Sequence, residues 1–231
     1  MELHNSKDFV LIAVAMDVGG IKDCKPIYEA AGSKFVTLVD PQNAMGEAWG
    51  FKLVPNGWLI DESGTLKAKW VGRMDVGRSQ VMDKVEKFLA APSVAKGSIK
   101  AVKSDAQLRS EYRAVLKKSP KDGPANLGIG QIMLRQGSAK EASTYLGRAV
   151  AAMPESANAM FALGSSILAQ GDKETALTIL KNALKLDSGN YLIRKQIWHV
   201  EYPEKFHPTI DWGWQREQMA RERAAEKKDG G

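Results

Sequence analysis

The spacing of apolar residues changes near residue 92, and the two sides of this point predict different kinds of domain. On the first side, Phe9–Val14 and Phe35–Val39 are continuous apolar runs of strand length, which are typical of strands buried on both faces. Gly57–Ile60 and Thr65–Val71 flank the turn residues Asp61-Glu62-Ser63-Gly64, and this arrangement predicts an antiparallel hairpin. Residues 1–91 are therefore expected to form an α/β domain.

Three helices are expected between and after these strands. The first would be capped by Asp23 and would end at Gly32. The second would be capped by Asp40 and would end at Gly50. The third is predicted over Val76–Leu89, where apolar residues recur at helical spacing.

After residue 104 the pattern is helical throughout, and it repeats at a step of 34 residues. The matching positions are small residues or leucines in both copies, namely Gly130 and Gly164, Ala142 and Ala176, Leu146 and Leu180, and Ala149 and Ala183. Because small residues let two antiparallel helices cross closely while leucine fills the space between them, each copy predicts a helical hairpin. Such a hairpin covers its apolar face only by packing against neighbouring copies.

These residues and their spacing resemble the tetratricopeptide repeat, with units at 123–156 and 157–190. In a helical domain over 105–214, a half-repeat helix at 105–118 precedes the units and a capping segment at 191–214 follows them. The resemblance implies a protein or peptide partner in a groove lined by the first helix of each unit, at Leu127, Gln131, Leu134, Asn158, Phe161, Ser165 and Leu168. An alternative, in which the two units only pack against the first domain, stays open.

The net charge of +6 is concentrated in residues 96–121, which hold eight basic side chains against Asp105 and Glu111. Residues 92–104 are accordingly expected to be a basic linker, and residues 215–231 a charged and solvated C-terminal tail. Tyr112 is the single aromatic residue of the basic stretch, so the stacking surface of a single-strand binder is missing. A solvated connecting face is preferred, and a nucleic-acid partner is not expected.

The segment 191–214 collects six of the seventeen aromatic residues of the chain, together with His199 and His207. These aromatic residues are expected to cover the last apolar helix, as the end of a repeat array requires. A partner-binding patch is one alternative, and a metal held by the two histidines with Glu201 or Asp211 is another. Because no metal-ligand spacing recurs, neither a metal site nor a cofactor is predicted.

The α/β domain resembles the thioredoxin superfamily, and within it the redoxin and TlpA-like branch. The motifs that carry the resemblance are Val10–Asp17, Phe35–Asp40, Ala48–Phe51, Leu53-Val54-Pro55 and Trp58–Gly64. In that family the matching proline is cis and faces the active-site cysteines, so the resemblance implies a cis-proline loop at Val54 and Pro55. The whole chain is similar to bacterial redoxin proteins that join a thiol-disulfide domain to a partner-docking array.

The chain departs from the family at its start. In the family, a core strand and a helix carrying Cys-x-x-Cys precede the strand matched by Phe9–Val14, and the eight residues before that strand are too few for both. We therefore expect an N-terminally incomplete thioredoxin-like domain without catalytic residues, followed by an all-α tetratricopeptide domain. The missing strand would lie centrally, and the two open edges would close on each other, take a strand from a partner, or mark a fragment of a longer protein. The fragment is the most economical of the three.

Cys24 is the single cysteine of the chain and a candidate redox thiol between Lys22 and Lys25, although a structural role is preferred. The expected function is non-catalytic protein–protein binding, with a redox partner or a second copy of the chain at the open sheet edge as a further partner. The alternative is a thiol-disulfide oxidoreductase or peroxiredoxin-like enzyme whose catalytic N-terminal segment is missing from the sequence. No apolar run approaches the ~20 residues of a membrane-spanning helix, so no membrane partner is expected and the cytoplasm is the default compartment.

Overall fold

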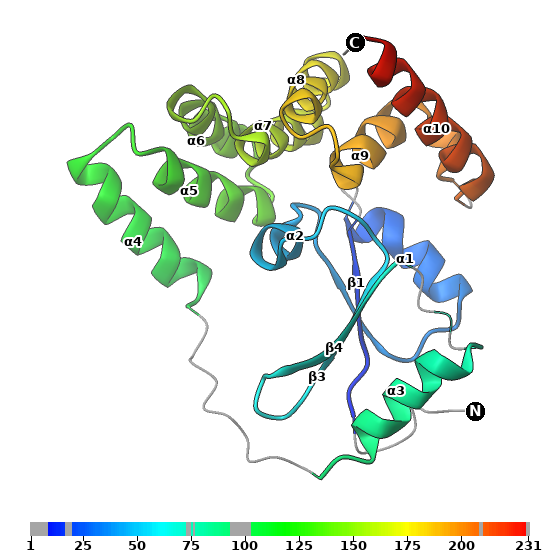
Figure 1. Ribbon diagram of the computed structural model, residues 1–231. Coiled ribbons are helices and arrows are strands. Elements are labelled where there is room, and N and C mark those ends of the chain that lie inside the picture. Colours follow the sequence, from blue (N-terminus) through cyan, green and yellow to red (C-terminus); the bar gives the residue numbers. More distant parts are fainter. Residues whose placement is uncertain are drawn as a thin grey trace.

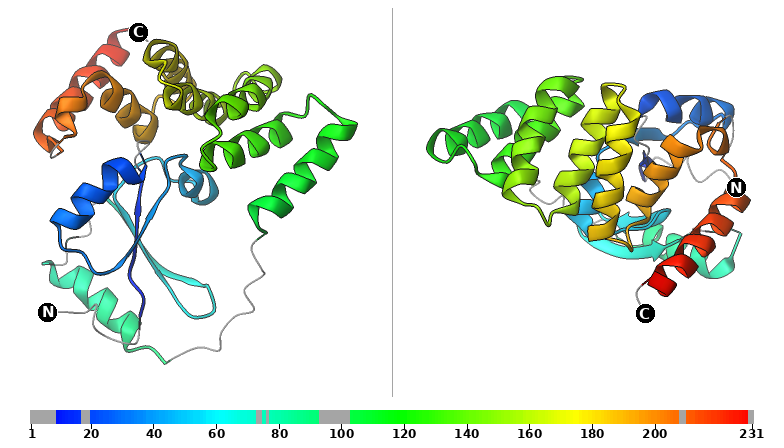
Figure 2. Two further views of the ribbon diagram at one scale, coloured as in Figure 1. Left: turned by 180° about the vertical axis from the view of Figure 1, so that it is seen from behind. Right: turned by 90° about the horizontal axis from the view of Figure 1, so that it is seen from above.

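The computed structural model describes residues 9–16, 20–72, 75, 77–92, 103–207 and 210–229. Its elements form an α/β unit up to residue 92 and a helical array from residue 103, in the order that the sequence predicts (Figure 1). The helical array lies over one end of the α/β unit, where α1 meets the end of α9 and α2 meets the end of α5 (Figures 1 and 2). Most of the predicted basic linker lies outside the described residues.

The α/β unit contains two separate two-stranded sheets. β1 (Ile12–Ala15) runs parallel to β2 (Val36–Val39), with Ile12 opposite Val36, and α1 (Ile21–Ala30) connects them. β3 (Asn56–Ile60) and β4 (Leu66–Val71) form the predicted antiparallel hairpin, with Asn56 opposite Val71. Among the described residues β1 pairs only with β2 and β3 only with β4, so the two predicted open edges do not close on each other there.

The hairpin turn between β3 and β4 is organised by Asp61. One carboxylate oxygen of Asp61 accepts hydrogen bonds from the Ser63 hydroxyl at 2.6 Å and from the backbone N–H groups of Ser63 and Thr65 at 3.0 and 2.9 Å. The other oxygen lies 3.0 Å from Nζ of Lys67. The Ser63 hydroxyl, with the other donors, holds the pKa of Asp61 far below its ordinary range, so this aspartate serves the turn as an anion.

The three helices of the α/β unit begin elsewhere than predicted. α1 begins at Ile21, so Asp23 lies in its first turn and does not cap it. Asp40 does accept hydrogen bonds from the N–H groups of Ala44 and Met45, at 2.9 and 2.8 Å, but α2 (Ala44–Trp49) starts four residues after it. α3 covers Ser79–Leu89.

The helical array repeats with the step that the sequence predicts. α4 (Asp105–Lys118) comes first, and the two hairpins are formed by α5 (Gly123–Arg135) with α6 (Ala139–Ala152) and by α7 (Ala157–Ala169) with α8 (Lys173–Leu186). The starts of α5 and α7 differ by 34 residues, as do those of α6 and α8. The caps keep the same step, because the side chains of Asp122, Ser156 and Asn190 each accept a backbone hydrogen bond at the start of α5, α7 and α9.

The matched small residues form the crossing points inside the hairpins, as predicted. A Cβ at Gly130 would lie 2.5 Å from Cγ of Leu146, and one at Gly164 would lie 2.9 Å from Cγ of Leu180. Both leucines are fully buried. The repeated Gly–Leu pair therefore sets how closely the two helices of each unit approach.

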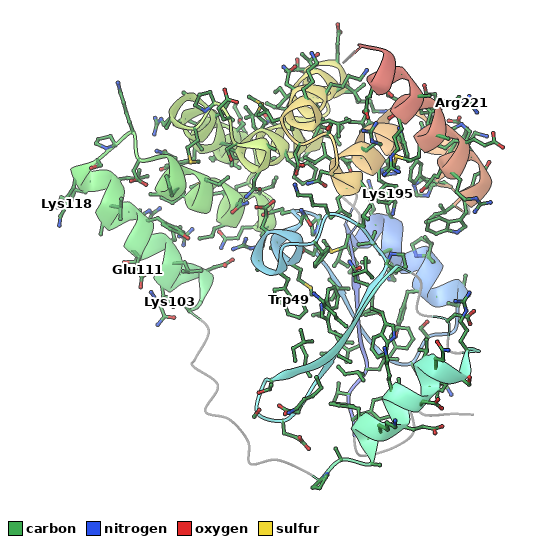
Figure 3. The ribbon with its side chains drawn as sticks, in the orientation of Figure 1. Trp49, Lys103, Glu111, Lys118, Lys195 and Arg221 are labelled. Atoms are coloured by element: carbon green, nitrogen blue, oxygen red, sulfur yellow. The ribbon has the colours of Figure 1, made fainter. Side chains whose placement is uncertain are left out.

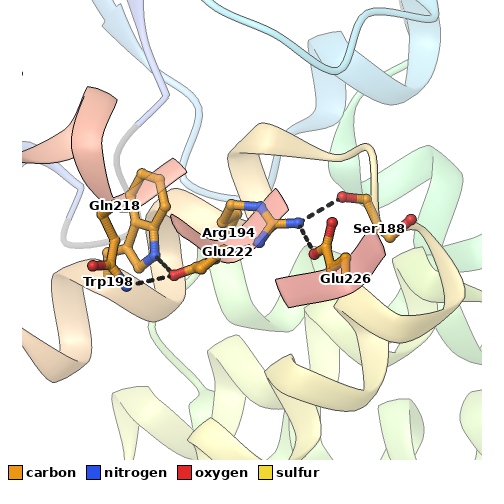
Figure 4. A network of polar contacts seen from close by, with 6 residues as sticks. All are labelled: Ser188, Arg194, Trp198, Gln218, Glu222 and Glu226. Carbon is orange, nitrogen blue, oxygen red and sulfur yellow. Dashed lines mark hydrogen bonds and ion pairs between the residues drawn. The ribbon is translucent and has the colours of Figure 1, made fainter. Parts of the chain in front are cut away.

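Most described side chains of the charged tail predicted from residue 215 are exposed, but the tail is not fully solvated. α9 (Tyr191–Glu201) is followed by a short 3-10 turn (Pro203–Lys205) and by α10 (Trp212–Asp229). The predicted boundary between the capping segment and the tail, at residue 215, lies within α10. The tail docks through a buried cation, because Arg194 of α9 binds Glu222 and, at 2.6 Å, Glu226 of α10 (Figure 4). The sequence pattern missed this contact because a charged helix face that is buried by ion pairing has no apolar period.

The same network also fixes the aromatic cap of the array. Nε1 of Trp198 donates a 2.6 Å hydrogen bond to Glu222, and Gln218 donates to the same carboxylate at 2.8 Å (Figure 4). Trp198 is 1% exposed and packs edge-on against Trp214, with ring centroids 5.7 Å apart. In the described part of the chain, no helix combines the length and apolar character needed to cross a membrane.

Candidate functional site

The predicted groove residues lie on the first helices of the two units, and the structure divides them into two groups. Leu127 and Leu134 of α5 pack against the buried cluster of Ala142, Leu146 and Ala162 while staying partly exposed. Gln131, Asn158 and Leu168 are also partly exposed. These five side chains are the accessible part of the predicted groove, which we call the α5–α7 face.

Phe161 and Ser165 are more deeply buried than the other predicted groove residues. Each is only 4% exposed. Phe161 packs with Leu180 and Ile193 in the core formed by α7, α8 and α9, and the Ser165 hydroxyl donates a 2.9 Å hydrogen bond to the Phe161 carbonyl. The assignment of Phe161 to the groove is therefore wrong, because α9 packs on this part of α7 and the two-unit repeat pattern does not contain α9, whereas Ser165 reaches only the cavity described next.

A cavity of about 420 Å³ lies at the end of the α5–α7 face, where the helical array meets α1. Ser165 and Leu168 of α7 line it together with Gln196 of α9 and Lys22 of α1. Nε2 of Gln196 is buried without a hydrogen-bond partner. Lys22, Lys173 and His199 are the ionisable lining groups, and Lys22 and Lys173 give the cavity positive charge.

The cavity residues that the sequence missed come from outside the repeat comparison. Lys22 belongs to the α/β unit, and Gln196 belongs to α9, which has no second copy of its own to compare. Asn190 at the start of α9 was a detectable signal, since it continues the cap spacing of Asp122 and Ser156.

The helical array packs against the α/β unit, which is part of the alternative in which the two repeat units only cover the first domain. The backbone N–H of Tyr191 donates to the Lys52 carbonyl at 3.1 Å, and Nζ of Lys52 lies 2.7 Å from Asp187. Burial, followed by the nearby negative charge of Asp187, raises the pKa of Glu47, and Lys52 opposes that rise. These contacts between the two units are polar, and the α5–α7 face stays partly exposed.

The predicted redox features are placed as follows. Cys24 lies in α1 with 7% of its surface exposed, which does not give it the partially exposed setting of a reactive thiol. The Val54–Pro55 peptide bond is cis, the isomer predicted from the sequence. Pro55 precedes β3, at the edge of the hairpin sheet.

The described part of the basic segment is partly neutralised by acidic residues. Nζ of Lys103, which lies just before α4, is 2.7 Å from Glu111 in the middle of that helix, and Lys118 lies at the far end (Figure 3). Arg135 of α5 binds Asp105 at 2.7 Å. These pairs account for both acidic residues that the sequence placed within this segment.

The two histidines of the capping segment come together, but with a different acid from those considered in the sequence. Nε2 of His199 and Nε2 of His207 are 3.2 Å apart, and Asp23 of α1 completes the cluster. Glu201 instead pairs with Lys181, and Asp211 with Lys205. Asp23 and His199 are 176 positions apart in the sequence, which is why no local spacing indicated this cluster.

Comparison with known proteins supports the helical part of this description. Residues 134–191 match the family model of the tetratricopeptide repeat. Among solved structures the chain is similar to a mutant O-GlcNAc transferase of Thermobaculum terrenum, at 25% identity over 42% of this chain and 19% of that chain, with a TM-score of 0.39. The chain therefore spans about a fifth of the length of that transferase. No curated protein matches the chain.

The family match has one functional consequence. Tetratricopeptide repeats indicate interaction with a protein partner, and the matched residues 134–191 include most of both predicted units. The match lies wholly within the helical array, so the thioredoxin-like interpretation of the α/β unit stays a prediction.

Proposed function

We propose that the helical array binds an extended segment of a partner protein along the α5–α7 face. The observation that carries this proposal is the accessible group Leu127, Gln131, Leu134, Asn158 and Leu168 on the first helices of two tandem hairpins. The leucines offer apolar contact to alternate side chains of a peptide. The amides of Gln131 and Asn158 offer both donors and acceptors to its backbone.

The cavity at the end of this face adds a charge preference. Lys22 and Lys173 line it together with Gln196. A carboxylate is the group that these donors fit best, either as an acidic side chain or as a chain terminus. The proposed ligand is therefore a peptide that combines apolar residues with a carboxylate at one end.

We further propose that the α/β unit is a thioredoxin-like domain that takes part in binding and lacks thiol chemistry of its own. The separation of the β1–β2 and β3–β4 sheets supports this interpretation. The same separation favours the second candidate function, a thiol-disulfide enzyme whose catalytic strand and helix are supplied from outside this sequence. Buried Cys24 argues against catalysis by the chain alone.

The binding proposal is tested by selecting displayed random peptides against the full chain and measuring their affinities by isothermal titration calorimetry. We expect apolar peptides with a carboxylate, and we expect Gln131→Ala with Asn158→Ala to weaken the selected peptides about 10-fold, as the loss of one or two hydrogen bonds predicts. Lys173→Glu should weaken the same peptides further.

Thr144→Ala is the matched control, because Thr144 is exposed on α6 and lies outside the α5–α7 face. Peptides that bind the Gln131/Asn158 variant as tightly as the wild type would contradict the proposed face. A failure to enrich any peptide would contradict the proposed function.

The enzyme candidate is tested separately with an insulin-reduction assay on this chain and on its Cys24→Ser variant. We expect no turnover from either protein. Turnover that disappears in Cys24→Ser would show that the single thiol is catalytic, and turnover that survives the substitution would contradict both interpretations of the α/β unit.

A further inference from the structure

Three potential metal ligands from distant parts of the chain converge where the α/β unit meets the helical array. Asp23 lies in the first turn of α1, His199 in the last turn of α9, and His207 directly after the 3-10 turn that follows α9. One ligand atom of each lies within 4.8 Å of the other two. This Asp23–His199–His207 cluster is separate from the α5–α7 face.

The distances within the cluster are close to those of a filled coordination sphere. Nε2 of His199 lies 3.2 Å from Nε2 of His207 and 3.4 Å from Oδ2 of Asp23, and Nε2 of His207 lies 3.8 Å from Oδ1 of Asp23. Nitrogen and oxygen ligands bound tetrahedrally to zinc at about 2.0–2.1 Å are about 3.3 Å apart from one another. The two shorter separations match this value closely. The third is to the other carboxylate oxygen of Asp23, so small rotations of the Asp23 and His207 side chains would be needed to bring a single carboxylate oxygen into place.

The fold holds the two imidazoles in this arrangement. His207 donates its backbone N–H to the Pro203 carbonyl at 3.2 Å, which fixes the residue to the 3-10 turn. The buried ring of Phe206 packs against His199 with a centroid distance of 5.1 Å. His199 is thereby held between α9 and the turn, with Nε2 facing Asp23.

Asp23 supplies a second and independent observation. Its Oδ2 atom is buried and has no hydrogen-bond partner. A buried carboxylate oxygen without a donor is costly, and native structures usually satisfy such an atom with a proton donor, a water or a cation. A cation between the three residues would satisfy it.

We propose that Asp23, His199 and His207 bind a divalent transition-metal ion, with zinc as the preferred metal. Two imidazoles and one carboxylate form a borderline ligand set that suits zinc, and that is also found around non-haem iron(II). Magnesium and calcium prefer all-oxygen sites and should bind weakly. Because 47% of the His207 side chain is exposed, a solvent molecule can reach the remaining coordination position.

The proposed metal would join the two units of the protein. Asp23 belongs to the α/β unit, and both histidines belong to the capping segment of the helical array. An ion bound by all three residues would hold α1 against the end of α9, beside the cavity that Lys22 and His199 line. The proposal does not depend on which partner the α5–α7 face binds.

The site is tested by titrating the metal-free, tag-free full chain with Zn²⁺ and, separately, with Co²⁺, Fe²⁺ under anaerobic conditions, and Mg²⁺. We expect one Zn²⁺ per chain, a tetrahedral absorption spectrum with Co²⁺, and no saturable binding of Mg²⁺. Asp23→Asn and His207→Gln should each weaken Zn²⁺ binding by about 10–100-fold or more, since each removes one of three protein ligands.

Two control variants separate this site from other sources of binding. His4→Gln replaces the remaining histidine of the chain and should leave the affinity for Zn²⁺ unchanged. Asp187→Asn removes the Lys52–Asp187 contact between the same two units and should change the affinity by only a few fold. Hydrogen exchange should show that Zn²⁺ protects α1 and the end of α9 in the wild type and in neither ligand variant.

Several results would overturn the proposal. They are the absence of stoichiometric Zn²⁺ binding, unchanged affinity in both Asp23→Asn and His207→Gln, and loss of binding in His4→Gln. Tighter binding of Fe²⁺ than of Zn²⁺ would keep the site and overturn the choice of metal.

Discussion

Replacing Gly130 with alanine tests whether the glycines at the helix crossings determine the packing of the repeats. The added Cβ would lie 2.5 and 2.6 Å from Cγ and Cδ2 of Leu146 and 3.3 Å from the Ala142 carbonyl oxygen. Leu146 is fully buried, so it cannot move away without displacing its neighbours. We expect this overpacking to cost about 1–3 kcal/mol of unfolding free energy.

A matched variant removes the contribution of helix propensity from this comparison. Gly147 lies inside α6, and a Cβ there would have no atom within 4 Å. Gly147→Ala should therefore stabilise the protein by about 1 kcal/mol, the usual gain from replacing glycine with alanine in a helix. Because Gly130→Ala receives the same gain, the difference between the two variants isolates the overpacking cost of about 1–3 kcal/mol.

The assay is urea unfolding of the full chain, followed by far-ultraviolet circular dichroism. The transition of the helical array should move to lower urea in Gly130→Ala and to higher urea in Gly147→Ala. Adding Leu146→Ala to Gly130→Ala should give less destabilisation than the sum of the single changes, with a coupling of about 0.5–3 kcal/mol. A Gly130→Ala protein as stable as Gly147→Ala would show that the contact between position 130 and Leu146 does not limit the approach of the two helices.

Three further predictions concern charged groups. Arg194→Ala leaves Glu222 and Glu226 without their cation and should lower the free energy of unfolding by about 2–3 kcal/mol, whereas breaking a fully buried pair costs about 3–5 kcal/mol. Unfolding and proteolysis of α10 measure this change. The control is Arg221→Ala, which removes the exposed Arg221–Glu217 pair and should change the free energy of unfolding by at most about 0.5 kcal/mol. Glu47 has a raised pKa, so its contribution to stability is present in acid and is lost as the pH rises through that pKa. Glu47→Gln should flatten this loss in unfolding curves measured from acidic to neutral pH. An unchanged pH profile would contradict the raised pKa of Glu47. Asp61 has a lowered pKa, so its contribution to stability is present at neutral pH and is lost as the pH falls through that pKa. Asp61→Asn should therefore be destabilising at neutral pH and should approach the stability of the wild type in strong acid. Thermal unfolding at several pH values would detect this difference.

The repeats could be predicted from the sequence because their packing depends on residue size at fixed spacing. Gly130 with Leu146 and Gly164 with Leu180 form the same crossing in the structure that the 34-residue step indicates in the sequence. The hairpin at Asp61 was equally accessible, since its turn is held by hydrogen bonds between residues that are near neighbours in the chain.

The rest of the candidate site could not be predicted because it depends on contacts between distant segments. Phe161 occupies a groove position of its repeat, yet the packing of α9 buries it. Asp23 has the spacing of a helix cap, yet the approach of α1 to α9 places it beside His199. The docking of α10 rests on one buried arginine, and no local pattern of charged residues distinguishes such a helix from a solvated one.

Binding of a partner peptide to the α5–α7 face can be located residue by residue in a two-dimensional NMR titration of the isotopically labelled full chain with the tightest selected peptide. We predict that the largest chemical-shift changes occur at Leu127, Gln131, Asn158 and Leu168, and extend to Gln196 in the cavity. Changes confined to the outer surfaces of α6 and α8, with these five residues unaffected, would contradict the account.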